Sequence, residues 1–137
     1  MRQPLLLDTC AALWIVAGEI SQETIDVLGE ARSAGLLTYV SPITAWEVGM
    51  LAQKGRFRSA YSPQRWFEQL MKAPHTALAE LSAKVMMESS FLPGKLHFDP
   101  AARIIAATAR EYGYTVVTRD RALLDYAERG YLSATEC

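Results

Sequence analysis

The chain has 137 residues, and half of them are hydrophobic, so it can bury one core without needing a second domain. Its 14 lysines and arginines nearly balance 15 aspartates and glutamates, so the overall charge does not call for a long nucleic-acid groove or an anionic membrane, and any polyanion must be held locally. The two cysteines, Cys10 and Cys137, lie near opposite ends without metal-ligand spacing. We therefore expect a single domain over residues 1–137, with reduced thiols, in the cytoplasm.

Short β-rich runs alternate with longer helical runs, which is typical of an α/β domain with a central parallel sheet flanked by helices. The first apolar run is too short for a signal peptide or a membrane span, and Asp8 ends it. In chain order we expect a strand at 5–7, helices at 11–16 and 21–34, a strand at 36–40, a helix from Pro42 to about Gly55, a helix near 63–70, a strand at 78–81, helices after Ser82 and after Asp99, a strand at 114–118 and a helix from about Arg121.

The helix expected after the second strand has a strong start signal. The hydroxyl of Ser41 can accept an unpaired backbone N–H, and Pro42 at the first helical position loses no hydrogen bond. Glu47 then lies on the second turn of this helix. Three basic residues near the helix end suit either the helix dipole or a phosphate backbone: Lys54, Arg56 and Arg58.

The aromatic and methionine residues in the middle of the chain are interpreted as packing residues. Trp66 and Phe67 have the spacing of a buried helix face, although docking of a partner helix or stacking on a nucleic-acid base is a second interpretation. Met50, Met86 and Met87 are predicted to pack rather than to form a cofactor site.

Several common catalytic motifs are absent from the sequence. There is no Gly-rich phosphate loop, H-E-x-x-H, C-x-x-C or G-x-S-x-G, which excludes P-loop, zincin, dithiol redox and α/β-hydrolase chemistry. His75 and His97 are too isolated to form a zinc site, and we interpret His97, next to Phe98, as a local hydrogen-bonding residue rather than a ligand.

Three acidic residues stand where an apolar run meets a break or a new element: Asp8, Glu47 and Asp120. Ligands of open parallel sheets bind beyond the carboxyl ends of the strands, where these side chains would meet. Each acid also has a structural interpretation, since Asp8 and Asp120 can cap helices and Glu47 can be a solvated helix residue. Their shared placement at strand ends favours a metal site.

Four segments together resemble the PIN domain family, and most closely the VapC-type toxins. They are LLLDT at 5–9, SPITAWEV at 41–48, LHFDPAARIIAATA at 96–109 and VTRD at 117–120. The resemblance covers nearly the whole chain in the same order. It implies a parallel-sheet fold, a Mg²⁺- or Mn²⁺-dependent endoribonuclease, inhibition by a VapB-type antitoxin and a homodimer. Candidates for the antitoxin-binding groove are Trp14, Trp46 and residues 61–71.

The resemblance also implies roles for individual residues. Asp8 would be the primary metal ligand, completed by Glu47 and Asp120, with the hydroxyls of Thr9 and Thr118 supporting them. Mg²⁺ suits such a site, because it keeps several waters and binds one or two carboxylates together with the substrate phosphate. Three arginines either guide RNA phosphates or form surface ion pairs: Arg103, Arg119 and Arg121.

One position departs from the family pattern. VapC-type proteins carry an aspartate immediately before the arginine that corresponds to Arg103, and here that position is Ala102. Asp99 lies three residues earlier, where it either compensates or caps the helix that Pro100 begins. An introduced substitution, a natural loss of activity and activity retained by three acids each explain Ala102.

Three functions follow from these alternatives. The first is a metal-dependent ribonuclease. The second is a binding module that holds RNA or an antitoxin without cleaving. The third is a phosphoacceptor receiver domain, which is disfavoured because Asp8 has no adjacent acidic partner on the first strand.

Overall fold

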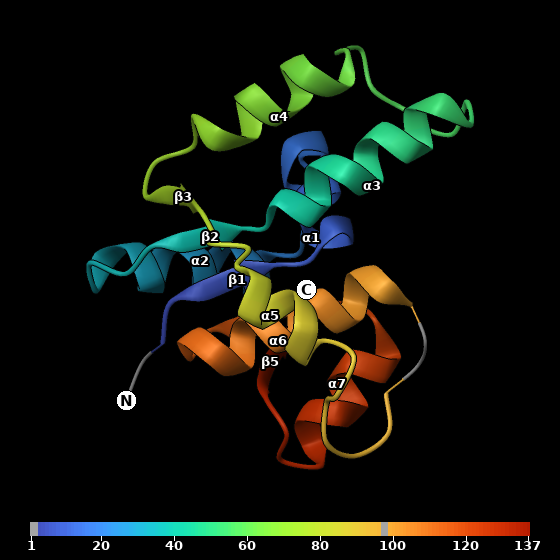
Figure 1. Cartoon of the computed structure of the whole chain (residues 1–137). Helices are drawn as coiled ribbons and strands as arrows, with labels where there is room; N and C mark the ends of the chain where they lie inside the picture. The colour runs from blue at the N-terminus through green and yellow to red at the C-terminus, as the bar shows by residue number, and fades with distance from the viewer. Residues whose placement is uncertain (1–2, 97–98) are drawn as a thin grey trace.

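The computed structural model describes residues 3–96 and 99–137, and it contains a five-stranded parallel sheet with helices on both faces (Figure 1). The strand order is β3-β2-β1-β4-β5, and every neighbouring pair is parallel. The strands are β1 (Leu5–Leu7), β2 (Thr38–Val40), β3 (Thr76–Leu78), β4 (Thr115–Thr118) and β5 (Ser133–Glu136). The α/β class with a central parallel sheet, expected from the sequence, is confirmed.

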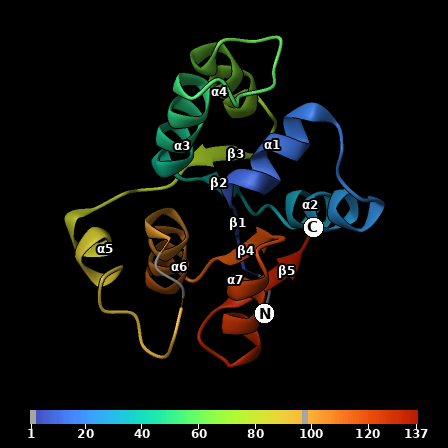
Figure 2. The same cartoon turned by 90° about the vertical axis from the view of Figure 1, so that its right-hand side faces the viewer.

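Helices connect the strands throughout the described part of the chain. Figure 2 shows α1 and α2 on one side of the sheet and α5 and α6 on the other. In both views α3 and α4 lie side by side beyond β2 and β3. The helices are α1 (Thr9–Ala17), α2 (Gln22–Ser33), α3 (Pro42–Gln53), α4 (Pro63–Met71), α5 (Ala83–Glu88), α6 (Pro100–Tyr112) and α7 (Arg121–Glu128).

The core divides into two layers because consecutive strand residues point to opposite faces of the sheet. Leu5 and Leu7 of β1 pack with buried residues of α1, α2 and α4, including Trp66. Leu6 faces the opposite way and packs against α6, where Ile105 is buried. Both faces of the central strands are therefore covered, which is why β1 and β4 are apolar throughout their middle.

Each helix begins at a side chain that accepts a backbone N–H. The predicted caps at Ser41, Ser82 and Asp99 are confirmed, with Pro42 and Pro100 in the first turns of their helices. Asp8 and Asp120 cap α1 and α7 in the same way. The structural interpretation of these two aspartates is therefore correct, and it does not prevent them from sharing a site.

Some predicted boundaries are wrong. The strand expected at 78–81 lies at Thr76–Leu78, and the strand expected at 36–40 is shorter, at Thr38–Val40. The edge strand β5 at Ser133–Glu136 was not predicted, because it has no apolar run. None of the described helices is long and apolar enough to cross a membrane.

The packing predictions hold for aromatic residues and fail for methionines. Trp66 is buried against Phe57 and Phe67. Met86 and Met87 are instead 43% and 64% exposed, since both lie on the outer face of α5. Met50 is also exposed. His75 has a positive φ of 57° on the surface, and the prediction for His97 lies outside the described residues.

Candidate active site

The candidate site lies at the carboxyl ends of β1 and β4, which are neighbours in the sheet. Leu7 pairs with Val117, so Asp8 and Thr118 emerge side by side from adjacent strands. The chain leaves β1 toward β2 on one side, whereas β4 lies on the other, so this is the point at which the strand order reverses. Parallel α/β sheets bind their ligands at such a point.

Asp8 is almost fully buried at this junction. Its Oδ1 accepts the Ala11 backbone N–H at 2.8 Å, and its Oδ2 accepts the Thr118 hydroxyl. The Thr118 Oγ1 in turn accepts the Asp120 backbone N–H at 2.9 Å. Burial raises the pKa of Asp8, and the charge of Asp120 raises it further, while the two hydrogen bonds work in the opposite direction. Asp8 is therefore held in place but is costly to ionise without a nearby cation.

Glu47 reaches the same region from α3. The Thr9 hydroxyl donates to Glu47 Oε1, and Thr9 Oγ1 lies 3.0 Å from Thr44 Oγ1. Burial raises the pKa of Glu47, and the charges of Asp99 and Asp8 add to this effect, although the Thr9 hydrogen bond lowers it. Thr9, which contacts Thr44, therefore orients one carboxylate oxygen of Glu47.

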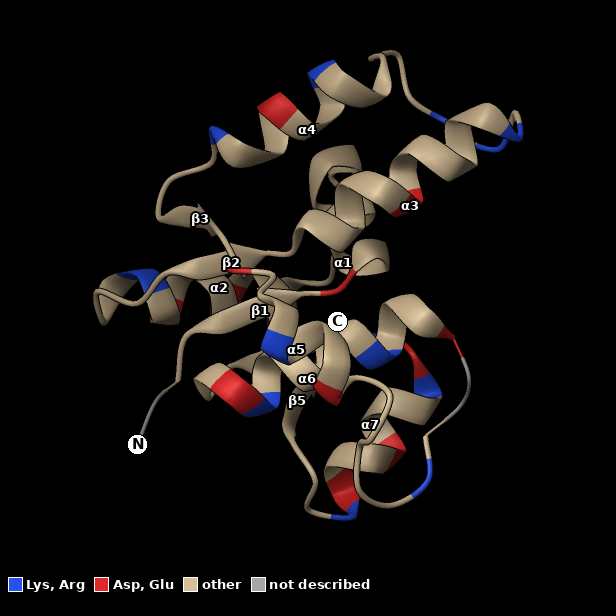
Figure 3. Ribbon diagram, viewed as in Figure 1, with Lys and Arg blue, Asp and Glu red and all other residues tan. Residues whose placement is uncertain are grey.

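These acids line one cavity of about 360 Å³. Figure 3 shows acidic segments at the start of α1, on α3 and near the start of α6, on the same side of the molecule. The predicted site residues that line the cavity are Asp8, Thr9, Glu47, Asp99, Ala102, Arg119 and Asp120. Thr118 is fully buried beneath Asp8.

Ala102 presents a methyl group to this cavity. It lies on α6 and is 6% exposed, with Leu123 also in the cavity wall. Asp99 lines the cavity too, and its Oδ1 accepts the Ala101 backbone N–H at 3.3 Å as the cap of α6. The structure therefore brings both residues to the site that the sequence predicted.

The three candidate arginines have different surroundings. Arg119 lines the cavity, whereas Arg103 and Arg121 do not. Arg103 donates to the carbonyl oxygens of Ser89 and Leu96 at 2.8 and 3.1 Å. Arg121 forms exposed ion pairs with Asp125 and Glu136 at 3.7 and 3.8 Å.

The donor set suits a hydrated hard cation better than a tightly caged metal. Within residues 3–96 and 99–137, no three Asp, Glu, His or Cys side chains form a ready-made ligand cluster. Mg²⁺ needs only one or two carboxylates, because waters and substrate oxygens complete its octahedron. Asp8 and Asp120 with Glu47 provide oxygen atoms alone, and a cation there would offset the unfavourable burial of Asp8.

Two residues at the site were not predicted from the sequence, and a third, Trp14, was predicted in a different role. Thr44 lies one turn before Glu47 on α3, so the helical spacing of the two residues could have predicted that they lie on the same face. Cys10 lines the cavity, and burial together with Asp8 raises the pKa of its thiol to about 11, so it stays protonated. Trp14 was a candidate for the antitoxin-binding groove. Its contact with Arg119 could not be predicted, because the two residues are far apart in the chain.

Comparisons with known proteins agree with this geometry. A PIN domain family model matches residues 5–129. The chain is 36% identical over 121 residues to Ribonuclease VapC22 of Mycobacterium tuberculosis (strain ATCC 25618 / H37Rv), across 87% of this chain and 88% of that protein. The fold resembles VapBC2 from Rickettsia felis, solved bound to a promoter DNA fragment, with a TM-score of 0.69 and 15% identity over 96% of this chain and 97% of that one. It also resembles FitAcB from Neisseria gonorrhoeae, with a TM-score of 0.52 and 20% identity over 95% of each chain. The chain therefore belongs to the PIN domain family, and its resemblance to VapC-type proteins is confirmed.

Proposed function

We propose that this protein is a divalent-cation-dependent endoribonuclease and the toxin of a VapBC-type pair. The observation that carries the proposal is the single cavity at the switch point of the sheet, into which Asp8, Glu47 and Asp120 converge. The relative named Ribonuclease VapC22 supports the choice of RNA as substrate. A VapB-type antitoxin, a homodimer and a cytoplasmic location belong to the same proposal.

The chain's own residues divide the work of phosphodiester hydrolysis. Asp8 and Asp120 would hold Mg²⁺ or Mn²⁺, and Asp8 is fixed for this role by Thr118 and by the start of α1. The bound cation supplies positive charge that offsets the charge on the phosphoryl oxygens and the leaving oxygen. Glu47, oriented by Thr9 through Oε1, accepts at Oε2 the proton of the attacking water. The raised pKa of Glu47 makes it a better base than an exposed carboxylate.

Ala102 weakens this site in the present chain. A methyl group stands where VapC-type proteins carry a carboxylate, and Asp99 already serves as the cap of α6. The protein therefore retains its fold and its acidic cavity with one oxygen ligand fewer. We expect cation affinity and cleavage below those of a four-acid site.

Two variants, compared with the present chain, test the proposal. We expect Mn²⁺ to bind the present chain, to bind Ala102→Asp roughly tenfold or more tightly, and to bind Asp8→Asn hardly at all, as measured by calorimetry. RNA cleavage in Mg²⁺ should rise with Ala102→Asp and disappear with Asp8→Asn. A chain that cleaves RNA equally well with and without chelator would contradict the proposed role of the acids.

Ala102 also motivates a second candidate function, a binding module that has lost catalysis. Such a protein binds its antitoxin or RNA but cleaves nothing, even after Ala102→Asp restores a carboxylate. Co-purification with the VapB-type partner combined with no cleavage by either form would favour the binding module over the nuclease.

A further inference from the structure

Glu47 is held by a short hydrogen-bond network that reaches the interior of the protein. The Thr9 hydroxyl donates to Glu47 Oε1, and Thr9 Oγ1 lies 3.0 Å from Thr44 Oγ1. A hydroxyl has one proton, and an ionised carboxylate can only accept hydrogen bonds. Because Thr9 donates its proton to Glu47, it accepts the proton of Thr44. Donation in this Glu47 network therefore runs from Thr44 to Thr9 and from Thr9 to Glu47.

Thr44 lies behind the cavity rather than in its wall. Its side chain is fully buried, whereas Thr9 and Glu47 line the acidic cavity. A buried threonine in a helix commonly donates to a carbonyl oxygen one turn earlier, as Thr108 Oγ1 does to Ile104 at 2.7 Å on α6. Thr44 Oγ1 instead has its hydrogen-bond partner, Thr9, on a different helix. The hydroxyl of Thr44 thus serves the site from outside the cavity.

The carboxylate of Asp8 is held by a comparable network. Thr118 Oγ1 accepts the Asp120 backbone N–H at 2.9 Å, and the Thr118 hydroxyl donates to Asp8 Oδ2. In each network a threonine therefore stands between an outer donor and a carboxylate. The outer donor for Asp8 is a backbone group, which a change of side chain leaves in place, whereas the outer donor for Glu47 is the side chain of Thr44. The Glu47 network can thus be interrupted by a substitution outside the cavity.

We infer that Thr44 is a positioning residue, which acts through Thr9 to hold the Glu47 carboxylate in the cavity. A hydroxyl rotates to suit its partners, so Thr9 needs a donor on its oxygen to keep its own proton directed at Glu47. Donation by Thr44 also polarises the Thr9 hydroxyl and strengthens its bond to Glu47. With Oε1 fixed in this way, Oε2 keeps one position relative to the attacking water. The inference deepens the proposed function, because its effect on cleavage rests on the role of Glu47 as base.

Cation-free crystal structures of two variants test the positioning directly. Thr44→Val removes the hydroxyl and keeps a branched side chain, whereas Thr44→Ser retains the hydroxyl. We expect the Glu47 carboxylate to lose its contact with Thr9 in Thr44→Val and to keep it in Thr44→Ser. These structures need neither a bound metal nor RNA, so their outcome is independent of the proposed nuclease activity.

Kinetics in the Ala102→Asp form, which restores the missing carboxylate, measure the consequence for cleavage. Adding Thr44→Val should lower kcat for RNA roughly tenfold, the contribution of one hydrogen bond, and leave KM unchanged. Adding Thr44→Ser instead should retain most of kcat. Mn²⁺ affinity should change little with either substitution, because Asp8 keeps its own donors. A threonine with a structural role alone would lower stability without separating kcat from KM.

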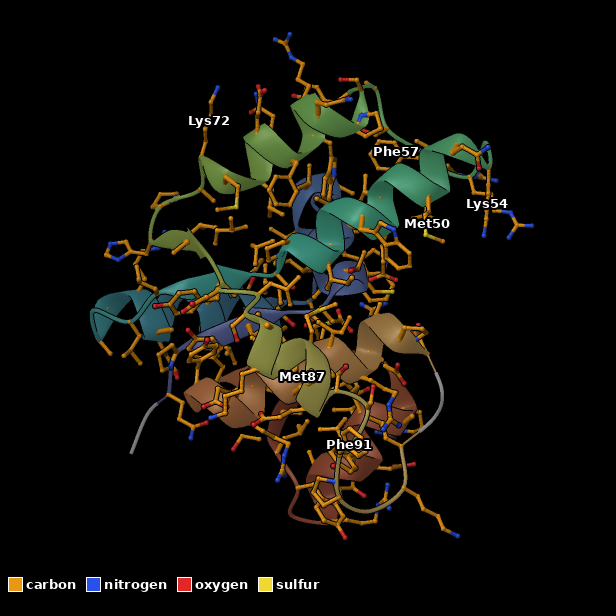
Figure 4. All side chains as sticks on the ribbon, in the orientation of Figure 1. Met50, Lys54, Phe57, Lys72, Met87 and Phe91 are labelled. Carbon is orange, nitrogen blue, oxygen red and sulfur yellow. The ribbon has the colours of Figure 1, made fainter. Side chains whose placement is uncertain are left out.

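A double variant and two controls separate the network from the surrounding packing. Thr9→Val should lower kcat at least as much as Thr44→Val, and adding Thr44→Val to it should cause little further loss. Thr108→Val makes the same change at a buried threonine whose hydroxyl bonds its own helix, and it should leave kcat unchanged. Met50→Ala changes α3 itself, on the part of the helix that Figure 4 shows extending beyond the sheet, and should also leave kcat unchanged.

Three results would overturn the inference. An unmoved Glu47 carboxylate in Thr44→Val would show that Thr9 needs no donor. Equal losses of kcat in Thr44→Val and Thr44→Ser would assign the effect to packing rather than to the hydroxyl. Additive losses in the double variant would mean that Thr44 does not act through Thr9. Absence of cleavage by the Ala102→Asp form, by contrast, would contradict the proposed function, while the crystal structures would still decide the role of Thr44.

Discussion

The acidic cavity and the segment at 89–96 satisfy their polar groups in opposite ways. In the cavity, carboxylates lie near one another, and burial together with their mutual repulsion raises the pKa of Asp8 and Glu47. Along 89–96, backbone carbonyls accept hydrogen bonds from the side chains of Arg103, Tyr126 and Arg129. The first region carries unfavourable charge that a ligand can offset, while the second is satisfied by the chain itself. The second region thus stabilises α6, which Asp99 caps and on which Ala102 lies.

The largest effect on the free energy of unfolding is expected from Gly94→Ala, in the segment at 89–96. Gly94 has a φ of +71°, and an added Cβ would lie 2.5 Å from the Tyr131 ring. The left-handed backbone and the overlap with an aromatic ring should together lower the free energy of unfolding by about 3 kcal/mol. Urea denaturation measures this difference directly.

Gly29→Ala is the matched control for Gly94→Ala. Gly29 lies in α2 with nothing within 4 Å of an added Cβ, and its φ is not positive. Alanine there should stabilise the helix by up to about 1 kcal/mol. Equal loss of stability in both variants would show that 89–96 is not the tightly fitted region.

A cation should raise the stability of the acidic cavity and leave 89–96 unaffected. Mn²⁺ at about 100 times its dissociation constant should stabilise the folded protein by about 2.7 kcal/mol, because it binds only the folded state. The melting temperature should therefore rise with Mn²⁺ and return to its starting value with chelator. The Asp8→Asn variant, which keeps the cap of α1, should show no such rise.

The contrast between the two regions also explains what the sequence could predict. Asp8 and Asp120 were predictable because each ends an apolar strand and begins a helix, two signals that adjacent residues carry. The stacking of Arg119 on Trp14 depends on how distant segments pack, so no local pattern indicates it. The close approach of Gly94 to Tyr131 was hidden for the same reason.

Errors in the prediction have a related cause. Hydrophobic residues are assigned to the core by composition, but the exposed Met86 and Met87 occupy the outer face of a short helix. The edge strand β5 has a polar sequence and is held by its pairing with β4, which no local propensity reveals.

Arg103 links the two regions, and its substitution tests which one it serves. It was a candidate for RNA contact, yet its guanidinium donates to the carbonyl oxygens of Ser89 and Leu96. Arg103→Leu leaves both acceptors without this donor and should lower the free energy of unfolding by about 2 kcal/mol. Arg103→Lys should recover only part of this loss, since an ammonium group cannot reproduce the planar fork.

Measurements of RNA affinity and stability on the same two variants separate the possible roles of Arg103. If Arg103→Lys binds RNA normally but remains destabilised, the residue acts by holding 89–96. If both variants keep full stability and lose RNA affinity, Arg103 contacts the substrate and the hydrogen bonds to Ser89 and Leu96 contribute little.

The smallest effect concerns the charge of Asp8 in the cation-free protein. Asp8→Asn removes a carboxylate whose pKa is raised by burial and by Asp120, and asparagine still accepts the Ala11 N–H. The variant should be more stable than the parent at neutral pH by an amount on the order of 1 kcal/mol. Chelator must be present, since a bound cation would reverse the sign of the difference.

The pH dependence of this difference follows from the direction of the pKa shift. With a pKa above its unfolded value, Asp8 holds its proton more tightly in the folded protein, so folding loses stability as pH rises through the interval between the two values. The difference between Asp8→Asn and the parent should therefore grow from about pH 4, near the ordinary pKa of aspartate, and level off above the raised pKa. Asp125→Asn is the control, because it removes a carboxylate that lies on the surface beside Arg121 and outside the acidic cavity. A difference for Asp8→Asn that shrinks with rising pH would mean that the cavity favours the carboxylate without a cation, and the contrast with 89–96 would then be lost.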